Sequence, residues 1–411
     1  MSNVDKVPAD DEVPVRLCNY TDVYNNEFIT LGLDFMQGTA TETEIEKFGL
    51  AIGDVIITKD SESWDDIGVP ALVRETASDL VCGYHLALLR PRKERIEGGF
   101  LFRCLQAKPV RVQLELSANG VTRFGIPKAD IGASMLPVPP LAVQRAIADY
   151  LDRETARLDA LVAAKERVLA LLAEKRRALI TRAVTRGLDP RAPLHDSGIP
   201  WLGEIPAHWD TVALRFLVAF TSGATPDTGR REYWDGEMPW VSPKDMKRGE
   251  IADAEDHVSE LALSKGSLRL VAPGAVLIVV RGMILAHSFP AAVTAAPVTI
   301  NQDMKALRCC GSLEPRFLRD FFRGHEEHVV SLADASAHGT RKLETEVLGR
   351  LEVALPPAAE QREIVAHIAD ATRRLDALRV ATEATIALLK ERRSALIAAA
   401  VTGQIDVGSA A

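Results

Sequence analysis

Apolar residues recur at helical spacing over two long stretches of this 411-residue chain. The first stretch carries them at steps of 7, 3, 7, 4 and 7 positions, at Leu151, Leu158, Leu161, Val168, Leu172 and Leu179. The second repeats these steps at Ile368, Leu375, Leu378, Thr385, Leu389 and Leu396. Such steps align side chains along one seam of a helix, as in a coiled coil. The pattern predicts two helices that each bury one seam against a partner.

The two stretches are copies of one sequence. Gln144 and Gln361 stand 217 positions apart (361 − 144), and the other matched pairs keep this separation, so neither copy carries an insertion. Two prolines precede each stretch and a glycine follows it, as expected at the starts and ends of helices. We predict helices over 139–186 and 356–403, packed antiparallel as a rigid spacer of roughly 65 Å, from a rise of ~1.5 Å per residue.

Shorter apolar runs outside the helices predict mixed α/β domains. Residues 52–58 and 86–89 are expected to form buried strands in the first half, and residues 239–242 and 274–280 in the second. Residues 110–116 alternate between apolar and polar, which favours a strand. The matching place in the second half, residues 323–332, looks more helical, so this element stays open between strand and helix.

The chain therefore reads as a tandem duplication of a domain followed by a helix. The fold class is α+β, with two mixed α/β domains, two long antiparallel helices and a pseudo-two-fold internal repeat. The domains themselves match more weakly, for example through Pro14 and Pro239. The expected divisions are a domain over 1–138, a helix over 139–186, a linker over 187–208, a domain over 209–355, a helix over 356–403 and a tail over 404–411.

Composition and charge narrow the function. The contents of 47% hydrophobic and 26% charged residues are ordinary for a globular protein. Five cysteines without zinc-site spacing and a polar N-terminus predict a cytoplasmic protein, and the longest apolar run, 275–280, is too short to span a membrane. The net charge is −8, yet residues 140–186 carry 10 basic and 6 acidic groups. Because phosphate neutralisation dominates DNA binding, the acidic domains are not expected to hold DNA unaided.

Motifs for catalysis, cofactors and metals are missing from the sequence. Residues 355–357 lack the asparagine and the aromatic residue of a methyltransferase motif, and residues 339–342 lack the second glycine of a Walker A loop. His325 and His328 have no cysteine or carboxylate partner at ligand spacing, so we expect them on the surface. We predict no catalytic and no metal-binding residue.

Several short motifs resemble those of the specificity subunits of type I restriction-modification systems. Their order and duplication carry the resemblance, which covers nearly the whole chain. The motifs are DSGIPWLGEIPAHW over 196–209, TSGATP over 221–226, PWVSPKDM over 239–246, INQD over 300–303 and GTRK over 339–342. Each domain also ends in PPxxxQ and a long helix that closes with KRRALI or ERRSALI.

The resemblance implies a non-catalytic DNA specificity subunit. In that family each target-recognition domain reads one half of a split double-stranded DNA site, and the paired helices set the gap between the halves. The helices bind two modification (methyltransferase) subunits, and restriction (translocase-nuclease) subunits join the complex. S-adenosylmethionine, ATP and Mg are expected only on these partners. Two related but different domains imply an asymmetric target, with base readout here and much of the phosphate contact from the partners.

Candidate DNA contacts lie at strand ends and in the family motifs. In the second domain they are Ser222, Thr225, Lys244, Arg281, Gln302, Arg341 and Lys342, and in the first domain Tyr20, Lys59, Tyr84 and Arg123. Glutamine can pair with adenine and arginine with guanine. Structural roles compete, because Arg341 and Lys342 are equally suited to capping the following helix. The arginine pairs at 176–177 and 392–393 are expected on a solvated face, with a partner contact as the alternative.

One departure from the family pattern concerns the first domain. If Pro14 matches Pro239, no room is left for a counterpart of residues 222–226. We therefore expect this domain to be shortened at its N-terminus by roughly 25 residues, through an upstream start or through divergence.

Two other function classes compete with this interpretation. A coiled-coil scaffold joining two protein-binding domains would explain the acidic domains directly, and it predicts binding to proteins without dependence on DNA. A single-chain DNA-modifying enzyme is disfavoured by the missing catalytic and cofactor motifs.

Overall fold

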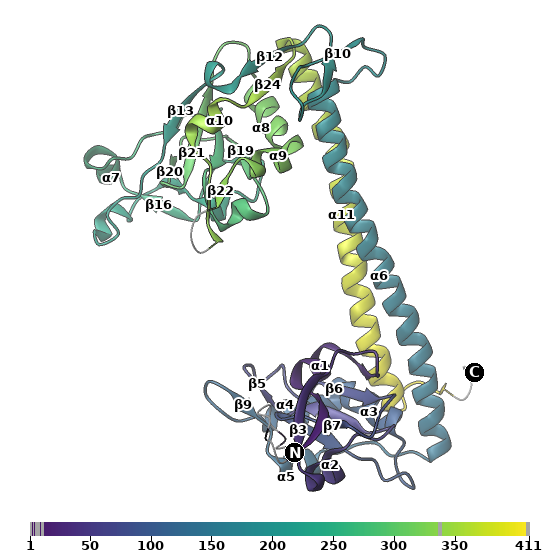
Figure 1. Cartoon of the computed structure of the whole chain (residues 1–411). Coiled ribbons are helices and arrows are strands. Elements are labelled where there is room, and N and C mark those ends of the chain that lie inside the picture. The colour runs from purple at the N-terminus through teal and green to yellow at the C-terminus, as the bar shows by residue number, and fades with distance from the viewer. Residues whose placement is uncertain (1, 3, 5–8, 10–11, 336–338, 408–411) are drawn as a thin grey trace. The chain divides into compact units, whose positions relative to one another are not determined.

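The computed structural model describes residues 2, 4, 9, 12–335 and 339–407. The chain divides into two compact units. The first unit comprises Met1–Arg167 and Thr382–Ala411, and the second comprises Val168–Ala381. Each unit contains one mixed α/β domain and a part of each long helix (Figure 1).

Two sheets and a two-stranded pair build the domain of the first unit. One sheet has the order β2 (Phe28–Ile29), β6 (Pro70–Val73), β4 (Val55–Thr58), β8 (Leu86–Leu89), and the other β3 (Met36–Ala40), β1 (Val13–Cys18), β7 (Leu80–Cys82). β5 (Asp60–Ser61) pairs with β9 (Phe124–Gly125). The helices are α1 (Tyr20–Asn25), α2 (Glu42–Phe48), α3 (Gly98–Gln106), α4 (Lys108–Ser117) and α5 (Lys128–Ala133).

The central strand β4 is apolar throughout because both its faces are covered. Ile56 packs into the core beside β1 and β7, whereas Val55 and Ile57 pack against α3 and α4 on the other face. β4 and β8 confirm the strands predicted within 52–58 and 86–89, and Gly53 provides the turn before β4 with φ of 91°.

Of the two alternatives left open at residues 110–116, the structure supports the helix, because these residues lie in α4. Pro109 occupies the first turn, where its missing N–H costs nothing. Val110 and Leu114 are both buried, one helical turn apart, against the core of the domain. Packing of this face decided the conformation, and the helical interpretation drawn from the second half was the better guide.

The domain of the second unit has more strands. Its largest sheet has the order β13 (Val218–Ser222), β21 (Met304–Cys309), β17 (Val276–Val279), β19 (Ala291–Thr294), β15 (Glu250–Ile251). The smaller groups are β16 (Asp256–Val258), β14 (Met238–Val241), β20 (Thr299–Ile300); β18 (Arg281–Gly282), β23 (Arg341–Lys342), β22 (Asp334–Ala335); β12 (Asp210–Ala213) with β24 (Glu352–Leu355); and β10 (Leu194–Asp196) with β11 (Glu204–Pro206). The helices of the domain include α7 (Glu260–Lys265), α8 (Pro315–Gly324), α9 (Glu326–Ser331) and α10 (Thr345–Gly349). β14 and β17 confirm the strands predicted over 239–242 and 274–280.

The two domains share a strand register, which corrects one predicted match. Thr58 opposite Leu86 in β4 and β8 corresponds to Val279 opposite Met304 in β17 and β21. The parallel pair β1 and β7 joins Cys18 to Cys82, and β14 and β20 join Val241 to Ile300. Cys18 is thus the counterpart of Val241, a separation of 223 positions (241 − 18). Pro239 then corresponds to Arg16, so the match to Pro14 is wrong by two residues.

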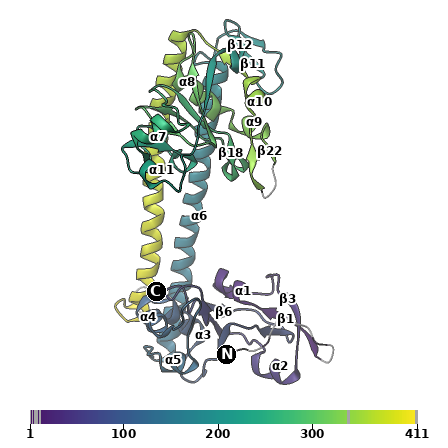
Figure 2. The same cartoon turned by 90° about the vertical axis from the view of Figure 1, so that its left-hand side faces the viewer.

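Both predicted long helices are confirmed as α6 (Leu141–Arg186) and α11 (Ala358–Val401). Figures 1 and 2 show them side by side within each unit. Gly187 and Gly403 follow their ends with φ of 69° and 75°, the conformation that glycine adopts without strain. In the first unit the beginning of α6 packs on the end of α11, and in the second unit Gly187, directly after α6, lies beside Glu360 in the first turn of α11, so the helices are antiparallel.

Most of the predicted seam is buried or half-buried, and two members are not. Leu161 and Leu378, which occupy equivalent positions in the repeat, are 44% and 51% exposed. The burial pattern runs from Leu158 to Val162 and Lys165, at steps of 4 and 3. The prediction for Leu161 and Leu378 is therefore wrong, because the step of 3 was taken one position too early. Leu151, Leu158, Val168, Leu172, Leu179, Ile368, Leu375, Leu389 and Leu396 are buried or half-buried as predicted.

A buried glutamine joins each domain to its long helix. Gln144 accepts a hydrogen bond from Glu97 N at 2.9 Å and donates to Arg95 O at 2.9 Å and Pro139 O at 2.7 Å. In the second unit Gln361 accepts from Glu314 N at 2.8 Å and donates to Ser312 O at 3.2 Å and Pro356 O at 2.8 Å. All three partners are displaced by the same 217 positions, for example 314 − 97. The glutamine of the PPxxxQ motif is therefore a structural link within each unit.

None of the helices in the described parts of the chain combines the length and the apolar character that a bilayer-spanning segment needs.

Candidate nucleic-acid interface

Polar and basic side chains of the second unit gather where β13, β18, β21 and β23 meet. Ser222 lies opposite Lys305 in the β13–β21 register, and Lys305 Nζ donates to Ser222 Oγ at 2.9 Å. Thr225 Oγ1 donates to Gln302 Oε1 just beyond the strand ends. Six of the seven predicted contacts of this domain fall in this region. We call Ser222, Thr225, Arg281, Gln302, Lys305, Arg341 and Lys342 the polar cluster.

Two backbone connections hold the basic members of the polar cluster together. Arg281 lies opposite Lys342 in the short β18–β23 ladder. Arg281 N also donates to Asp303 O at 3.3 Å, which ties this ladder to the loop that carries Gln302. Burial lowers the pKa of Lys305, and nearby Lys342 lowers it further while Glu344 opposes the shift. Sequence reasoning missed Lys305, because only the pairing with β13 places it beside Ser222.

The basic members of the polar cluster differ in their ion-pair partners. Lys342 Nζ lies 2.5 Å from Glu344, which precedes α10, so this lysine has an ion-pair partner and does not cap the helix. Within the described residues, Arg281 and Arg341 form no ion pair, and Arg281 is exposed. Among the described residues, the two guanidinium groups and Lys305 therefore have no carboxylate as an ion-pair partner.

Lys244 lies outside the polar cluster. Its Nζ is 2.9 Å from Asp256 and 3.3 Å from Glu255, and the hydrogen bond to Asp256 raises its pKa. Two carboxylates therefore already neutralise this lysine, which reduces its attraction for a phosphate.

In the first unit the predicted contacts gather around Asp60. Lys59 Nζ lies 5.4 Å from the centre of the Tyr84 ring and 3.5 Å from Asp60. Burial raises the pKa of Tyr20, and a hydrogen bond with Ser61 and the charge of Arg123 act against the rise. Tyr20, Lys59, Tyr84 and Arg123 thus converge on the β5–β9 pair. We call these four residues with Asp60 the aromatic cluster.

His85 is a member of this region that the sequence did not indicate. Its Nδ1 lies 2.6 Å from Asp60 Oδ2, and its ring centre lies 3.8 Å from that of Tyr84. Its φ is 68°, a value that non-glycine residues rarely adopt and that is held here beside candidate contacts. A non-glycine residue in this conformation leaves no signature in the sequence.

Because the two domains share a strand register, the two clusters can be compared position by position. Tyr84 and Gln302 are separated by 218 positions (302 − 84), the same as the strands β8 and β21 that follow them. Ser61 pairs with Phe124 as Gly282 pairs with Arg341, so Phe124 is the counterpart of Arg341. Arg123, the predicted contact, lies one position before this counterpart. Asp60 holds the position of Arg281, which reverses the charge between the two units.

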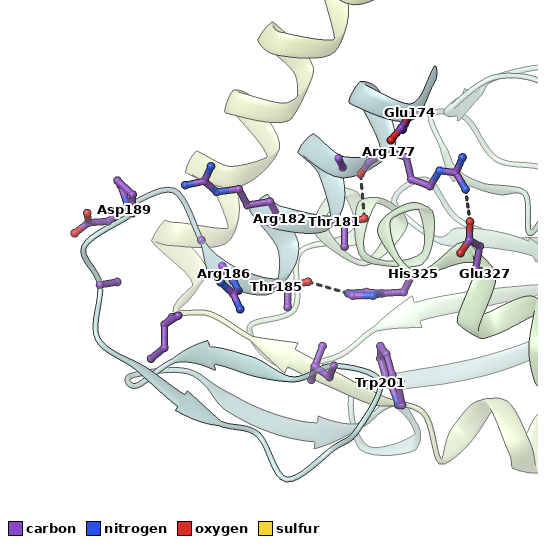
Figure 3. A pocket seen from close by; sticks show the side chains of 16 residues that line it. Glu174, Arg177, Thr181, Arg182, Thr185, Arg186, Asp189, Trp201, His325 and Glu327 are labelled. Carbon is purple, nitrogen blue, oxygen red and sulfur yellow. Dashed lines mark hydrogen bonds and ion pairs between the residues drawn. The ribbon is translucent and has the colours of Figure 1, made fainter. Parts of the chain in front are cut away.

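A separate pocket of about 920 Å³ lies beside the last turns of α6 (Figure 3). Thr185 Oγ1 and His325 Nε2 are 3.1 Å apart, and the ring of Trp201 stacks on His328 with centres 4.2 Å apart. Burial lowers the pKa of His325 to about 4, so its imidazole is neutral at neutral pH. The expectation that both histidines lie on the surface is wrong for His325. This residue is buried, because its ring packs against Trp201 of the linker. Among the described residues no group of three metal-ligating side chains exists here or elsewhere.

Of the two arginine pairs near the helix ends, Arg177 and Arg392 are exposed as expected, whereas Arg176 and Arg393 are half-buried. Arg176 pairs with Asp376, and Arg177 pairs with Glu327. Arg393 lies 2.6 Å from Glu27 and 2.9 Å from Asp159. Three of these four arginines thus have internal partners.

The sequence of this chain is similar to those of known proteins. Residues 206–386 match the type I restriction modification DNA specificity domain. The specificity subunit of the type I restriction enzyme EcoR124I/EcoR124II from Escherichia coli is 25% identical over 361 residues, which cover 85% of this chain and 80% of that one.

Two solved structures share the fold. One comes from a study of complex assembly and conformational transition of the type I R-M system; it is 21% identical, with a TM-score of 0.67 over 95% of this chain and 92% of that one. The other, the HsdS subunit from Thermoanaerobacter tengcongensis, is 19% identical, with a TM-score of 0.55 over 96% of this chain and 92% of that one. The duplicated α+β fold with its paired long helices is thus confirmed. The chain thus matches the DNA specificity domain of type I restriction-modification systems over residues 206–386, and over most of its length it is similar to a specificity subunit of such a system.

Proposed function

We propose that this subunit reads an asymmetric, bipartite double-stranded DNA site, one half with each domain. The observation that carries the proposal is the pair of clusters, which share a strand register but carry different side chains. Gln302 stands where the first unit has Tyr84, and Arg281 stands where it has Asp60. Equivalent positions with different hydrogen-bonding groups would recognise different bases.

Direct readout in the major groove fits the chemistry of these groups. Arginine binds guanine O6 and N7, glutamine binds adenine, and aspartate accepts from cytosine N4. In the polar cluster Arg281, Gln302 and Arg341 would face bases, while Lys305 and Lys342 would contact phosphates. In the aromatic cluster Asp60, Tyr84 and Lys59 would contribute, with Tyr20 and Arg123 beside them.

Two modification (methyltransferase) subunits are the proposed partners of the helices. Exposed leucines support this, because they occur in pairs related by the repeat: Leu161 with Leu378, and Leu171 with Leu388. Each pair is 217 positions apart (388 − 171), so each unit offers the same two apolar positions to a partner. Restriction (translocase-nuclease) subunits would join the complex, and S-adenosylmethionine, ATP and Mg would be bound by these partners.

The domain divisions are proposed in the same terms. Residues 1–138 and 209–355 would be the target-recognition domains, residues 139–186 and 356–403 the spacer helices, and residues 187–208 the linker. Of the tail over 404–411, residues 408–411 lie outside the described residues. The cytoplasmic location stays a prediction.

Co-expression with a methyltransferase subunit tests the proposal. The purified complex is expected to methylate DNA at one two-part target, which sequencing of the methylated bases would reveal. A scaffold without DNA reading would assemble with protein partners and show no sequence preference, and that result would end the proposal.

A further inference from the structure

The two units differ where each domain meets its long helices. In the second unit β12 pairs with β24, so that Asp210 lies opposite Leu355. Trp209, which precedes β12, is buried and donates from Nε1 to Glu360 Oε2 at 3.1 Å. Residues 205–213 thus cover the strand before α11 and the first turn of that helix.

The equivalent place in the first unit has no such cover among the described residues. The repeat maps residues 352–355 onto 135–138 and Glu360 onto Val143, each 217 positions earlier (360 − 143). Residues 134–140 form no strand. Met135, Val138 and Val143 are 75%, 59% and 44% exposed. The corresponding positions of the second unit, Glu352, Leu355 and Glu360, are half-buried, so the first unit is both more apolar and more open at this place.

A groove of about 740 Å³ lies at this surface. Its walls come from the segment before α6, the first turns of α6, and the end of α11 with the residues that follow it. The lining is mostly apolar, with Thr402 and Asp406 as its polar members, and includes Pro137, Pro139, Ala142, Ala146, Val401 and Ile405. All of these residues belong to the first unit.

The backbone of residues 135–138 can accept a strand despite Pro137. In the second unit Leu214 N donates to Leu351 O at 2.8 Å. Because hydrogen-bonding direction alternates along an antiparallel strand, Val353 and Leu355 also face the partner strand and Ala354 faces away. Pro137 is the counterpart of Ala354, so its missing N–H falls on the side that the added strand does not use.

We propose that this groove binds an extended polypeptide segment with the chemistry of residues 205–213. The segment would carry an apolar residue and a proline, then an aromatic residue over the first turn of α6, then a strand that pairs with residues 135–138. Strand addition supplies main-chain hydrogen bonds, and the groove supplies side-chain selectivity. The argument rests on the repeat and does not depend on DNA reading.

Position 143 makes the proposal specific. In the second unit the Glu360 carboxylate accepts a hydrogen bond from the indole N–H of Trp209. The first unit has Val143 at the equivalent position, so Val143→Glu would restore an acceptor for this hydrogen bond. One hydrogen bond corresponds to a gain of about three- to tenfold in affinity for a tryptophan-containing segment. A charge placed among the apolar lining residues, as in Ala146→Glu, would instead weaken binding by at least about tenfold.

The test uses the full chain and a labelled synthetic peptide with the sequence of residues 203–213, GEIPAHWDTVA. Fluorescence anisotropy is expected to show saturable binding that Ala146→Glu weakens, Val143→Glu strengthens, and the exposed control Ala163→Glu leaves unchanged. Replacing the peptide's tryptophan by phenylalanine should cancel the gain from Val143→Glu. Hydrogen exchange should show protection of the amides of Leu136 and Val138 on binding.

Three results would overturn the proposal. They are equal binding by wild type and Ala146→Glu, no protection at residues 136 and 138, and a concentration-dependent dimer that protects these amides without peptide, which would make a second copy the occupant.

Discussion

Arg393 Nε lies 2.9 Å from Asp159 Oδ1, joining α11 to α6 within the first unit. The same two positions of the repeat, Arg176 and Asp376, form an ion pair between the helices in the second unit. The roles are exchanged between the helices, because 393 − 176 and 376 − 159 both equal 217. The helix pair is therefore fastened by two related ion pairs, one in each unit.

Removing Arg393 is expected to destabilise the first unit. Its side chain is largely buried between Asp159 and Glu27, and Arg393→Ala would leave both carboxylates without this partner. We expect a loss of about 1–3 kcal/mol in the free energy of unfolding, between the values for exposed and buried pairs. Chemical denaturation measures it, with the neighbouring exposed Arg392→Ala as the control. Equal losses for the two variants would refute the role, and the double exchange Arg393→Asp with Asp159→Arg should recover part of the stability.

The buried glutamines provide a second prediction. Gln144→Glu has nearly the same shape, but a carboxylate cannot donate to Arg95 O and Pro139 O. We expect a loss of about 2–4 kcal/mol in the free energy of unfolding, because buried carbonyls lose their donor. Gln361→Glu should have the same effect in the second unit. Denaturant unfolding would detect both, and Gln37→Glu, at an exposed position of β3, is the control. Wild-type stability of Gln144→Glu would contradict the role of this side chain.

Acid should loosen the second unit through His325. Its pKa is about 4 when folded, below the ordinary value of 6.5, so the unfolded state takes up a proton first as pH falls. Stability is thus complete above about pH 6.5 and declines towards pH 4, by about 2 kcal/mol at pH 5. Burial lowers the pKa of His328 in the same direction.

Substituting His325→Gln should flatten this decline. Thermal unfolding at pH 7 and pH 5 compares the two proteins. An equal fall in the melting temperature of wild type and His325→Gln would show that other groups cause the acid sensitivity.

Variants in the polar cluster should distinguish residues that contact phosphates from residues that read bases. Lys305→Ala is expected to weaken DNA binding by the assembled complex for all sequences alike, and to reduce the slope of log K against log salt by about 1. Gln302→Ala is expected to cost about 1–3 kcal/mol at one base of one half-site only. Lys244→Ala is the control, because two carboxylates already pair with that lysine. Loss of preference in both half-sites on Gln302→Ala would contradict the assignment.

The sequence predicted the long helices well because their periodicity extends over many turns. It was less reliable for single positions, as Leu161 shows, since steps of 3 and 4 are both compatible with a seam. Residues 110–116 illustrate another limit: alternation over one short run could not reveal that Val110 and Leu114 pack one turn apart against the domain core.

The candidate site was predicted in outline only. Strand-end positions identified the region of the polar cluster, but pairing across strands decides its membership. Lys305 lies opposite Ser222 only through the β13–β21 register, and His85 depends on an unusual backbone conformation. The wrong match of Pro14 to Pro239 has the same origin. Where the two domains are only weakly similar in sequence, equivalent residues can be assigned only after the paired strands are known.

Matched insertions in the two helices test the central claim most directly. Four residues, about one turn, would be inserted after Ala163 in α6 and after Val380, its counterpart in α11. The methylated target of the assembled complex would then be sequenced. The account predicts the same two half-sites separated by a longer gap, and failed assembly when α6 alone is lengthened. An unchanged gap with both helices lengthened would contradict a spacer that sets the distance between two DNA readers.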